Sequence, residues 1–336
     1  MLMPLTAVLQ ATSAVPAPAR LQALVSAKCD RLPLPGSGQT LGRWQALAEV
    51  ASHDLSLAKL YEGHTDALAI LAELLPDDAP ERSPQGIWGT WAAEAPGCRV
   101  TVTEDGVLHG TKAWCSGASH VTHAVMTAWR DGGSNSPQLV AVDLRQPGVR
   151  VAPSHWHAVG MAATDTAQVH FDAAAARLVG SPGSYLCRPG FWQGGAGVAA
   201  CWWGGTLAIA QALHRAARAM PADALAAPFR WSALGRVDIA VSASAALLRE
   251  AAAWIDANPQ ADASTQALRT RQSAEQAARQ VLDLAGRALG PTPYCTDAAF
   301  ARMAADLPVF IRQSHAERDD ASLGHCLSQQ ERPWAL

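Results

Sequence analysis

The spacing of apolar side chains along this chain changes twice, and this change restricts the fold more than any single motif. Residues 7–75 carry apolar side chains at helical spacing, residues 87–178 form short β-rich runs separated by turn residues, and residues 197–318 return to helical spacing. A pattern of period 3.6 does not suit a strand, and a pattern of period 2 does not suit a helix. The sequence therefore predicts an α+β chain in which a β module lies between two helical regions.

Turn and capping residues place the expected elements. Asp54 and Ser56 separate two helices expected at 41–51 and 55–68, and the prolines at 76, 80 and 84 end the second. Short strands with turns between them are typical of an antiparallel barrel or sandwich. The expected strands are 100–103, 107–108, 121–129, 138–144, 149–152 and 167–171, and the later helices are 198–218, 237–256, 263–289 and 297–314.

Composition excludes several classes of protein. With 49% hydrophobic and 16% charged residues over 336 positions, the chain is too apolar to be disordered. A net charge of -3 does not provide the basic face that binds nucleic acid. No run approaches the roughly 20 apolar residues of a spanning helix, so we expect no membrane span.

The seven cysteines indicate a reducing compartment. They are odd in number and never spaced as Cys-x-x-Cys, which argues against a disulfide framework or a thiolate zinc site. The N-terminal apolar stretch, residues 5–11, has no basic residue before it, as a secretion signal would require. We therefore expect a cytoplasmic protein, with secretion as the alternative.

Three local patterns resemble parts of binding sites. The Gly195–Val198 segment matches a relaxed dinucleotide loop, but no buried strand precedes it and no acidic residue follows about 20 positions later, so we interpret it as a flexible entry to a helix. The histidine pairs 120/123 and 155/157 have no third ligand nearby for a metal, and we interpret them as surface or hydrogen-bonded histidines. The 12 tryptophans suit either a flat aromatic ligand or a core and subunit interface.

Two strings in the β region resemble those of one family. Residues 108–118, LHGTKAWCSGA, resemble the G-x-K-x-W-I-T-N-A strand of acyl-CoA dehydrogenases, and residues 159–172, VGMAATDTAQVHFD, resemble that family's G-M-R-G-S-D-T-x-x-V-x-F-D. The resemblance covers about residues 40–318. It implies an N-terminal helical domain (1–86), a central antiparallel β-barrel domain (87–185) and a C-terminal four-helix bundle (186–336).

The resemblance also implies a cofactor and its contacts. In that family FAD lies between the β domain and the bundle, which nominates Trp114 and Ser116 as contacts of the flavin ring. The family's R-x-x-F-G element, which grips the cofactor diphosphate, is altered at 231–235, where Arg230 and Arg236 stand beside it as possible substitutes. The family's bundles assemble into homodimers or homotetramers, and the expected partner is an acyl thioester carried by CoA or a carrier protein.

The family's catalytic glutamate has no counterpart at its usual position. Counting from Asp306, that position falls on Ser314, whose hydroxyl is too weakly basic to replace a carboxylate, and the alternative position falls near Val198. The first interpretation is a dehydrogenase that oxidises an acyl thioester at the α,β-carbons, with hydride passing to FAD and Glu317 or His315 as a displaced base.

Two further interpretations stay open. One is a flavin monooxygenase of the same fold, in which reduced flavin activates oxygen and His315 hydrogen-bonds the substrate. The other is a non-catalytic scaffold member with a degraded FAD site. A plain salt bridge within 317–320 is the alternative role for Glu317.

Overall fold

The computed structural model describes residues 4–79, 85–132, 135–331 and 334. Its contacts divide the chain into two compact units. The barrel unit consists of Met1–Leu32, Lys59–His157 and Ala162–Phe191, and the bundle unit consists of Pro33–Ala58, Ala158–Met161 and Trp192–Leu336. Each unit therefore collects segments that are distant in sequence, and the division into domains 1–86, 87–185 and 186–336 stays a prediction.

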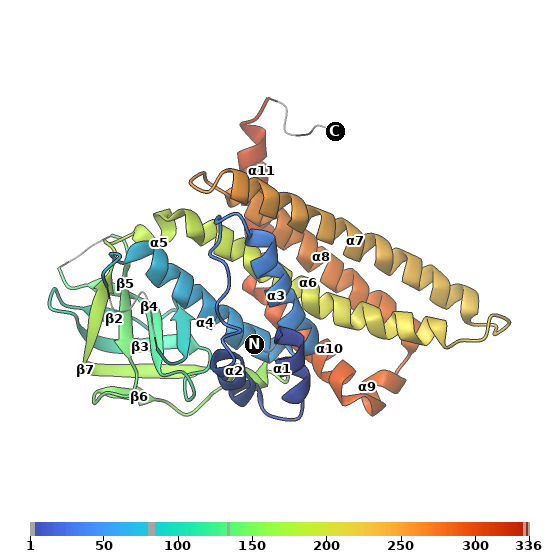
Figure 1. The fold of residues 1–336 in the computed structure, drawn as a ribbon, viewed down its shortest axis with the longest axis horizontal. Coiled ribbons are helices and arrows are strands. Elements are labelled where there is room, and N and C mark those ends of the chain that lie inside the picture. Colours follow the sequence, from blue (N-terminus) through green and yellow to red (C-terminus); the bar gives the residue numbers. More distant parts are fainter. Residues whose placement is uncertain (1–3, 80–84, 133–134, 332–333, 335–336) are drawn as a thin grey trace. The chain divides into compact units, whose positions relative to one another are not determined.

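Seven strands among the described residues of the barrel unit form one sheet (Figure 1). The path runs β1-β4-β2-β3-β7-β5, β5 also pairs with β4 to close the ring, and β6 joins along β7. The strands are β1 (Trp88–Trp91), β2 (Val100–Val102), β3 (Val107–Cys115), β4 (His123–Arg130), β5 (Gln138–Asp143), β6 (Val149–Val151) and β7 (Ala167–Val179). The predicted barrel is confirmed.

The expectation of a purely antiparallel sheet is wrong at β4, which has two parallel pairings. Both β1 and β2 pair with β4 in parallel, β1 along residues 123–126 and β2 along residues 129–130. The segment between β3 and β4 crosses over before β4 begins, so β4 runs in the same direction as the two earlier strands. Sequence periodicity does not report strand direction, and a crossover of this kind is invisible to it.

Helix α4 (Leu55–Leu74) supplies apolar side chains to the core of the barrel unit. In this core, Ile70 and Leu71 are fully buried and pack with Trp88 of β1 and Val125 of β4. Asp54 caps the start of α4 by accepting a hydrogen bond from the backbone N–H of Leu57 at 2.9 Å, as the sequence predicts. The unit also contains α1 (Leu5–Ala11), α2 (Ala17–Ser26) and α5 (Ser184–Cys187).

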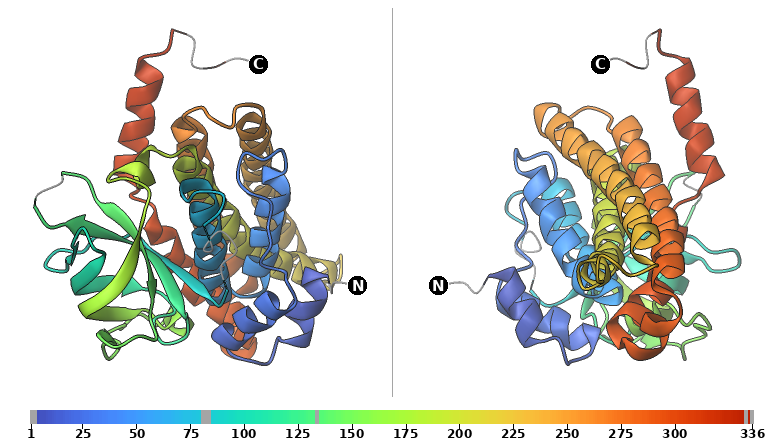
Figure 2. Two further views of the ribbon diagram at one scale, coloured as in Figure 1. Left: turned by 60° about the vertical axis from the view of Figure 1, so that its left-hand side comes forward. Right: turned by 90° about the vertical axis from the view of Figure 1, so that its right-hand side faces the viewer.

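The bundle unit is built from long helices that lie side by side (Figures 1 and 2). Its main helices are α6 (Pro189–Arg218), α7 (Ala227–Ala257), α8 (Ser264–Leu289) and α10 (Ala298–Phe310), joined by α3 (Thr40–His53), α9 (Thr292–Thr296) and α11 (Glu317–Ser328). The predicted four-helix bundle is confirmed. The expectation of a flexible entry at Gly195–Val198 is wrong, because α6 begins at Pro189 and includes these glycines.

Glycines in α6 explain how closely α3 packs on it. A Cβ at Gly204 would lie 2.2 Å from the carbonyl oxygen of Ala48, so the two helix backbones touch there. At Gly197 a Cβ would lie 3.3 Å from the indole nitrogen of Trp44. These glycines are therefore packing positions, and the match to a dinucleotide loop is coincidental.

Two of the described helices, α6 and α7, are long and apolar enough to cross a membrane by length and composition alone. Within its most apolar 18-residue window α6 is 67% buried inside the protein, whereas α7 is 22% buried. Core helices of soluble proteins pass the same test, so the finding is weak evidence, and the expectation of no membrane span stays a prediction.

Candidate functional site

The candidate site is built around Trp114, near the end of β3. The β3–β7 register shifts between Lys112 and Cys115, and within this irregularity Trp114 has a φ of 59°. A bulky residue in the left-handed region is strained by about 1–3 kcal/mol and persists only where its surroundings impose it. Ala113 and Cys115 stay buried while the Trp114 side chain is 56% exposed. The irregularity therefore presents an indole outward from the barrel.

A second tryptophan stands beside the first. The ring of Trp156, in the segment after β6, meets Trp114 edge to face, with centroids 6.3 Å apart and planes at 87°. This arrangement is the preferred geometry of an aromatic pair. The sequence does not distinguish Trp156 from the other tryptophans, because nothing in its own segment marks it as a neighbour of Trp114.

The hydroxyl groups of Ser116, Thr164 and Thr166 lie close to one another, and Ser116 is two residues after Trp114. The hydroxyl oxygens of Ser116 and Thr166 are 3.1 Å apart, and those of Thr164 and Thr166 are 2.8 Å apart. The backbone N–H of Gly117 donates to the carbonyl of Thr164 at 2.7 Å. The two motif strings therefore meet here. Sequence reasoning nominated Ser116 but missed both threonines, although the second string contains them.

The turn after Ser116 is fixed by an aspartate. Asp165, with a φ of 46°, accepts a hydrogen bond from the backbone N–H of Ser119 at 3.1 Å and lies 3.7 Å from the ring nitrogen of His120. His120 is exposed, and at this distance its contact with Asp165 is an ion pair rather than a hydrogen bond. Within residues 4–79, 85–132 and 135–331, no group of three or more His, Cys, Asp or Glu side chains is placed to hold a metal ion.

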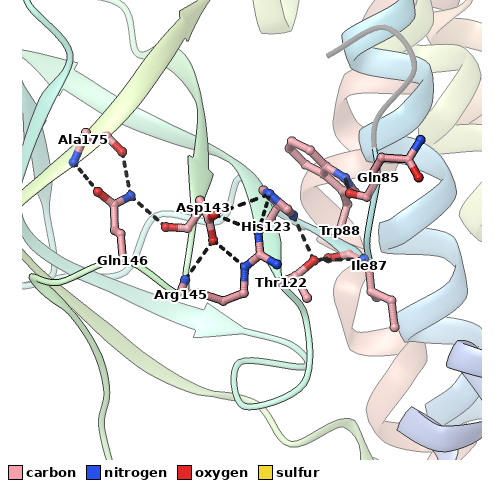
Figure 3. A network of polar contacts seen from close by, with 9 residues as sticks. All are labelled: Gln85, Ile87, Trp88, Thr122, His123, Asp143, Arg145, Gln146 and Ala175. Atoms are coloured by element: carbon pink, nitrogen blue, oxygen red, sulfur yellow. Dashed lines mark hydrogen bonds and ion pairs between the residues drawn. The ribbon is translucent and has the colours of Figure 1, made fainter. Parts of the chain in front are cut away.

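His123 belongs to a polar network at the start of β4 (Figure 3). Its Nδ1 lies 2.8 Å from the hydroxyl of Thr122, its Nε2 lies 3.9 Å from Asp143, and its ring stacks on Trp88 at 4.6 Å. Burial lowers the pKa of His123, and nearby Arg145 lowers it further, while Asp143 opposes both. Hydrogen bonds from Arg145 lower the pKa of Asp143 to about 2. The network fixes β1 and β5 to β4 by contacts that the sequence did not reveal.

The two arginines proposed from the sequence lie on α7. Arg230 donates from its guanidinium to the carbonyl oxygens of Ala216 and Ala288, both at 3.3 Å. These carbonyls belong to the last turns of α6 and α8, so Arg230 caps two helix ends. Arg236 is exposed. Two of the N–H groups of Arg230 are therefore already used within the bundle unit.

The segment proposed to carry the base, around Ser314 and Glu317, is not one continuous helix. Helix α10 ends at Phe310, and a 3₁₀ turn, Ile311–Gln313, follows. Ser314 is buried, Ala316 has a φ of 44°, and Glu317 begins the separate helix α11. Glu317 therefore does not continue the helix that contains Asp306, because α10 ends at Phe310 and α11 begins at Glu317.

His315 and Glu317 are both exposed. Two side chains of α8 hydrogen-bond to the backbone between α10 and α11. The side chain of Gln272 donates to the carbonyl of Ala316 at 3.1 Å, and Arg271 donates to the carbonyl of Gln313 at 3.0 Å. His315 is used locally, since its ring nitrogen lies 3.6 Å from Asp319.

A closed barrel and a helical bundle, with the two motif strings joined at one end of β3, define the fold of acyl-CoA dehydrogenases. Residues 89–174 match the model of the acyl-CoA dehydrogenase middle domain. The resemblance stated from the sequence is therefore confirmed, and so is the fold that it implied. No curated protein sequence matches the chain.

Three solved structures illustrate the likeness. KijD3, in complex with FMN and dTDP-3-amino-2,3,6-trideoxy-4-keto-3-methyl-D-glucose, has a TM-score of 0.81 and 18% identity over 97% of this chain and 92% of that one. FMN-bound TdsC from Paenibacillus sp. A11-2, a dibenzothiophene monooxygenase, has a TM-score of 0.81 and 17% identity over 98% of both chains.

The third structure is a dehydrogenase. Butyryl-CoA dehydrogenase from Megasphaera elsdenii has a TM-score of 0.75 and 16% identity over 86% of this chain and 82% of that one. The fold therefore occurs in a monooxygenase that was solved with FMN and in an acyl-CoA dehydrogenase, and identities this low show the fold alone.

Proposed function

We propose that this chain is a flavin-dependent oxidoreductase whose reaction is oxygenation. The observation that carries the choice of reaction is the buried Ser314 at the expected position of the base, followed by a break that starts a new helix at Glu317. Abstraction of an α-proton needs a carboxylate or imidazole at a fixed distance from the substrate. Oxygenation by a reduced flavin makes no such demand, and the flavin supplies the redox chemistry when bound.

Trp114 and its neighbours support the flavin part of the proposal. An outward-facing indole held in a strained backbone conformation suits a flat aromatic ring, against which it would pack. The hydroxyl of Ser116 would donate a hydrogen bond to the polar edge of that ring. In this proposal Trp156 buttresses Trp114, and Thr166 orients the Ser116 hydroxyl at 3.1 Å.

The identity of the flavin is a narrower question. FAD is the cofactor expected from the resemblance, whereas KijD3 and TdsC were solved with FMN. Arg230, proposed as a diphosphate contact, already donates to two helix carbonyls, which leaves it fewer free N–H groups. We propose a flavin site that accepts FMN as well as FAD, and flavin released by acid and separated by chromatography identifies which one is bound.

The dehydrogenase remains the second candidate function. It requires Glu317 or His315 to reach an acyl thioester, carried by CoA or a carrier protein, and both side chains are exposed. Replacement of Glu317 by Gln then abolishes bleaching by substrate while flavin stays bound. Unchanged bleaching in this variant removes Glu317 from the mechanism.

The first experiment measures flavin binding. The purified protein is mixed with FMN or FAD, and the flavin absorbance and its bleaching by dithionite are recorded. Trp114→Ala is expected to weaken flavin binding at least tenfold, whereas Trp334→Phe, a change at another exposed tryptophan, leaves it unaltered. Failure of the unsubstituted protein to bind either flavin favours the non-catalytic scaffold.

The second experiment separates the two reactions. Flavin-loaded protein is mixed without oxygen with a panel of acyl-CoA thioesters. In a separate arm it is reduced and mixed with oxygen and indole, the molecule bound in two TdsC structures. Oxygen-dependent product from the reduced protein supports oxygenation. Bleaching of oxidised flavin by an acyl-CoA in the absence of oxygen overturns it in favour of dehydrogenation.

Self-association is proposed from the exposed side of α7. Phe229, Trp231 and Ile239 on this helix are exposed, and aromatic side chains are enriched at subunit interfaces. A homodimer or homotetramer that covers them fits the expectation from the sequence. Light scattering of the protein and of Ile239→Glu tests this, with dissociation expected in the variant. A cytoplasmic location stays a proposal, which fractionation of the source cell tests.

A further inference from the structure

The bundle unit contains a groove where α3, α6 and α7 meet. Its volume is about 280 Å³, and none of the residues proposed above to contact a flavin lines it. One alanine from each helix, Ala48, Ala200 and Ala245, forms part of its lining, and these short side chains leave the space unfilled. The groove does not arise from separated helices, because the backbones of α3 and α6 touch where Gly204 meets Ala48.

The walls of the groove are held in place. The indole N–H of Trp203 donates to the carbonyl oxygen of Val241 on α7 at 3.1 Å, which fixes the ring between α6 and α7. Trp44, from α3, is 2% exposed and packs against Gly197. Leu207 and Leu248 extend the apolar lining. A preformed apolar groove with rigid aromatic walls is the usual form of a small-molecule site.

Charge is confined to the side chains at the mouth. Glu49 lines the groove but lies 3.5 Å from the ring nitrogen of His53, its neighbour one turn along α3. Arg249 lines it from α7 and is exposed, and no ion pair of Arg249 is found in the part of the chain that the structure describes. The groove lining therefore includes one guanidinium group, that of Arg249, with no counter-charge among the described residues.

We infer that this groove binds a small amphipathic anion, with its apolar chain along α3 and its carboxylate against Arg249. The lining positions on α3, from Leu41 to Ser52, span about 16 Å at 1.5 Å per residue, which suits an extended alkyl chain better than a compact ring. A guanidinium pairs with a carboxylate through two parallel hydrogen bonds, and it repels an amphiphile with a cationic head. The inference goes beyond the proposed flavin chemistry and does not depend on it.

Calorimetric titration with decanoate, decan-1-ol and decyltrimethylammonium, each below its micelle concentration, tests the inference. Decanoate is expected to bind most tightly. Arg249→Gln should weaken decanoate binding about tenfold, as the loss of a charge-assisted pair predicts, and leave decan-1-ol unchanged. Equal binding of the three amphiphiles, or of decanoate to the wild type and Arg249→Gln, overturns the assignment of an anion.

Ala245→Leu and Ala246→Leu form a matched pair on α7 that tests the location. Ala245 lines the groove, whereas Ala246 is exposed and does not. Ala245→Leu should abolish decanoate binding and Ala246→Leu should preserve it, with circular dichroism showing that both variants fold. Retained binding in Ala245→Leu overturns the inference. A change of oligomeric state in that variant, seen by light scattering, also overturns it, because the groove then holds a second copy.

The flavin content of every preparation is measured in parallel. Absence of flavin from all of them refutes the proposed function and leaves the groove assignment standing. Loss of decanoate binding in Ala245→Leu with flavin retained supports the groove independently of the redox chemistry.

Discussion

The indole N–H of Trp91 donates to the carbonyl oxygen of Ser116 at 3.0 Å and so fixes the chain two residues after the strained Trp114. Trp91 is 2% exposed and lies on β1. A Cβ at Gly89 would lie 2.7 Å from that indole nitrogen, so the absence of a side chain there lets the ring reach Ser116. A buried residue of one strand therefore determines the geometry of the candidate site on another.

Trp91→Phe tests this relationship. The variant loses the donor to Ser116 and part of a buried ring, and we expect the free energy of unfolding to fall by about 2 kcal/mol. Urea denaturation measures the change. Trp129→Phe is the control, since its indole N–H lies 3.4 Å from Glu94, and its cost should stay below about 1 kcal/mol. Equal costs in the two variants would show that the Ser116 contact contributes nothing specific.

Trp114→Gly separates backbone strain from function. Glycine adopts a φ of 59° without penalty, so the flavin-free protein should unfold at the same temperature or a higher one. Flavin affinity should fall at least tenfold because the indole is absent. Differential scanning calorimetry and flavin titration measure the two effects. A clear loss of thermal stability would mean that the indole packs for the fold rather than for a ligand.

His123 should give the protein a pH-dependent stability. Its pKa in the fold is lowered below the unfolded value of about 6.5, so the unfolded chain binds the proton first as pH falls. Stability contributed by neutral His123 is therefore present above about pH 6.5 and declines as pH falls toward the lowered value. The melting temperature, measured from pH 5 to 8, should depend less on pH in His123→Asn than in the wild type. The exposed His155 provides the control, as His155→Asn should keep the wild-type dependence.

The contribution of Asp306 to stability should change with pH in the opposite direction, falling as pH rises. It accepts a hydrogen bond from the backbone N–H of Met161 at 2.6 Å, and burial, with Asp54 nearby, raises its pKa. The carboxyl therefore contributes stability that is complete below about pH 3.9 and is lost as pH rises through the raised value. Asp306→Asn keeps the acceptor without the charge, so at pH 7 it should be at least as stable as the wild type.

Asp306→Ala provides the contrasting variant. It leaves the Met161 N–H without its partner and should cost about 1–3 kcal/mol at pH 7 in urea denaturation. If Asp306→Asn is destabilised as much as Asp306→Ala, the charge itself stabilises the contact and the argument from burial fails.

Substitution of Gly160 tests how closely the segment that contains Met161 packs on α10. A Cβ there would lie 2.1 Å from the carbonyl oxygen of Ala305, so Gly160→Ala should cost about 3 kcal/mol, the upper end of overpacking effects. Gly235→Ala on α7 is the matched control, because nothing lies within 4 Å of its Cβ, and it should stabilise the helix by about 0.5–1 kcal/mol. Similar melting temperatures for the two variants would contradict the close approach.

The sequence by itself determined the layers of this fold. Hydrophobic period depends only on which face of an element is buried, so the helical regions, the barrel strands other than β1 and the Asp54 cap could be predicted from neighbouring residues. The two motif strings also marked Trp114 and Ser116, because both lie within continuous, recognisable segments.

Only the tertiary structure decided what these residues contact. Thr166 reaches Ser116 across 50 residues and Trp91 reaches it across 25, and no local pattern reports such pairings. The parallel pairing of β4, the left-handed backbone at Trp114 and the break before Glu317 likewise result from strand crossover and helix packing. Local propensity sets each element, whereas contacts between distant segments set the direction in which each side chain points.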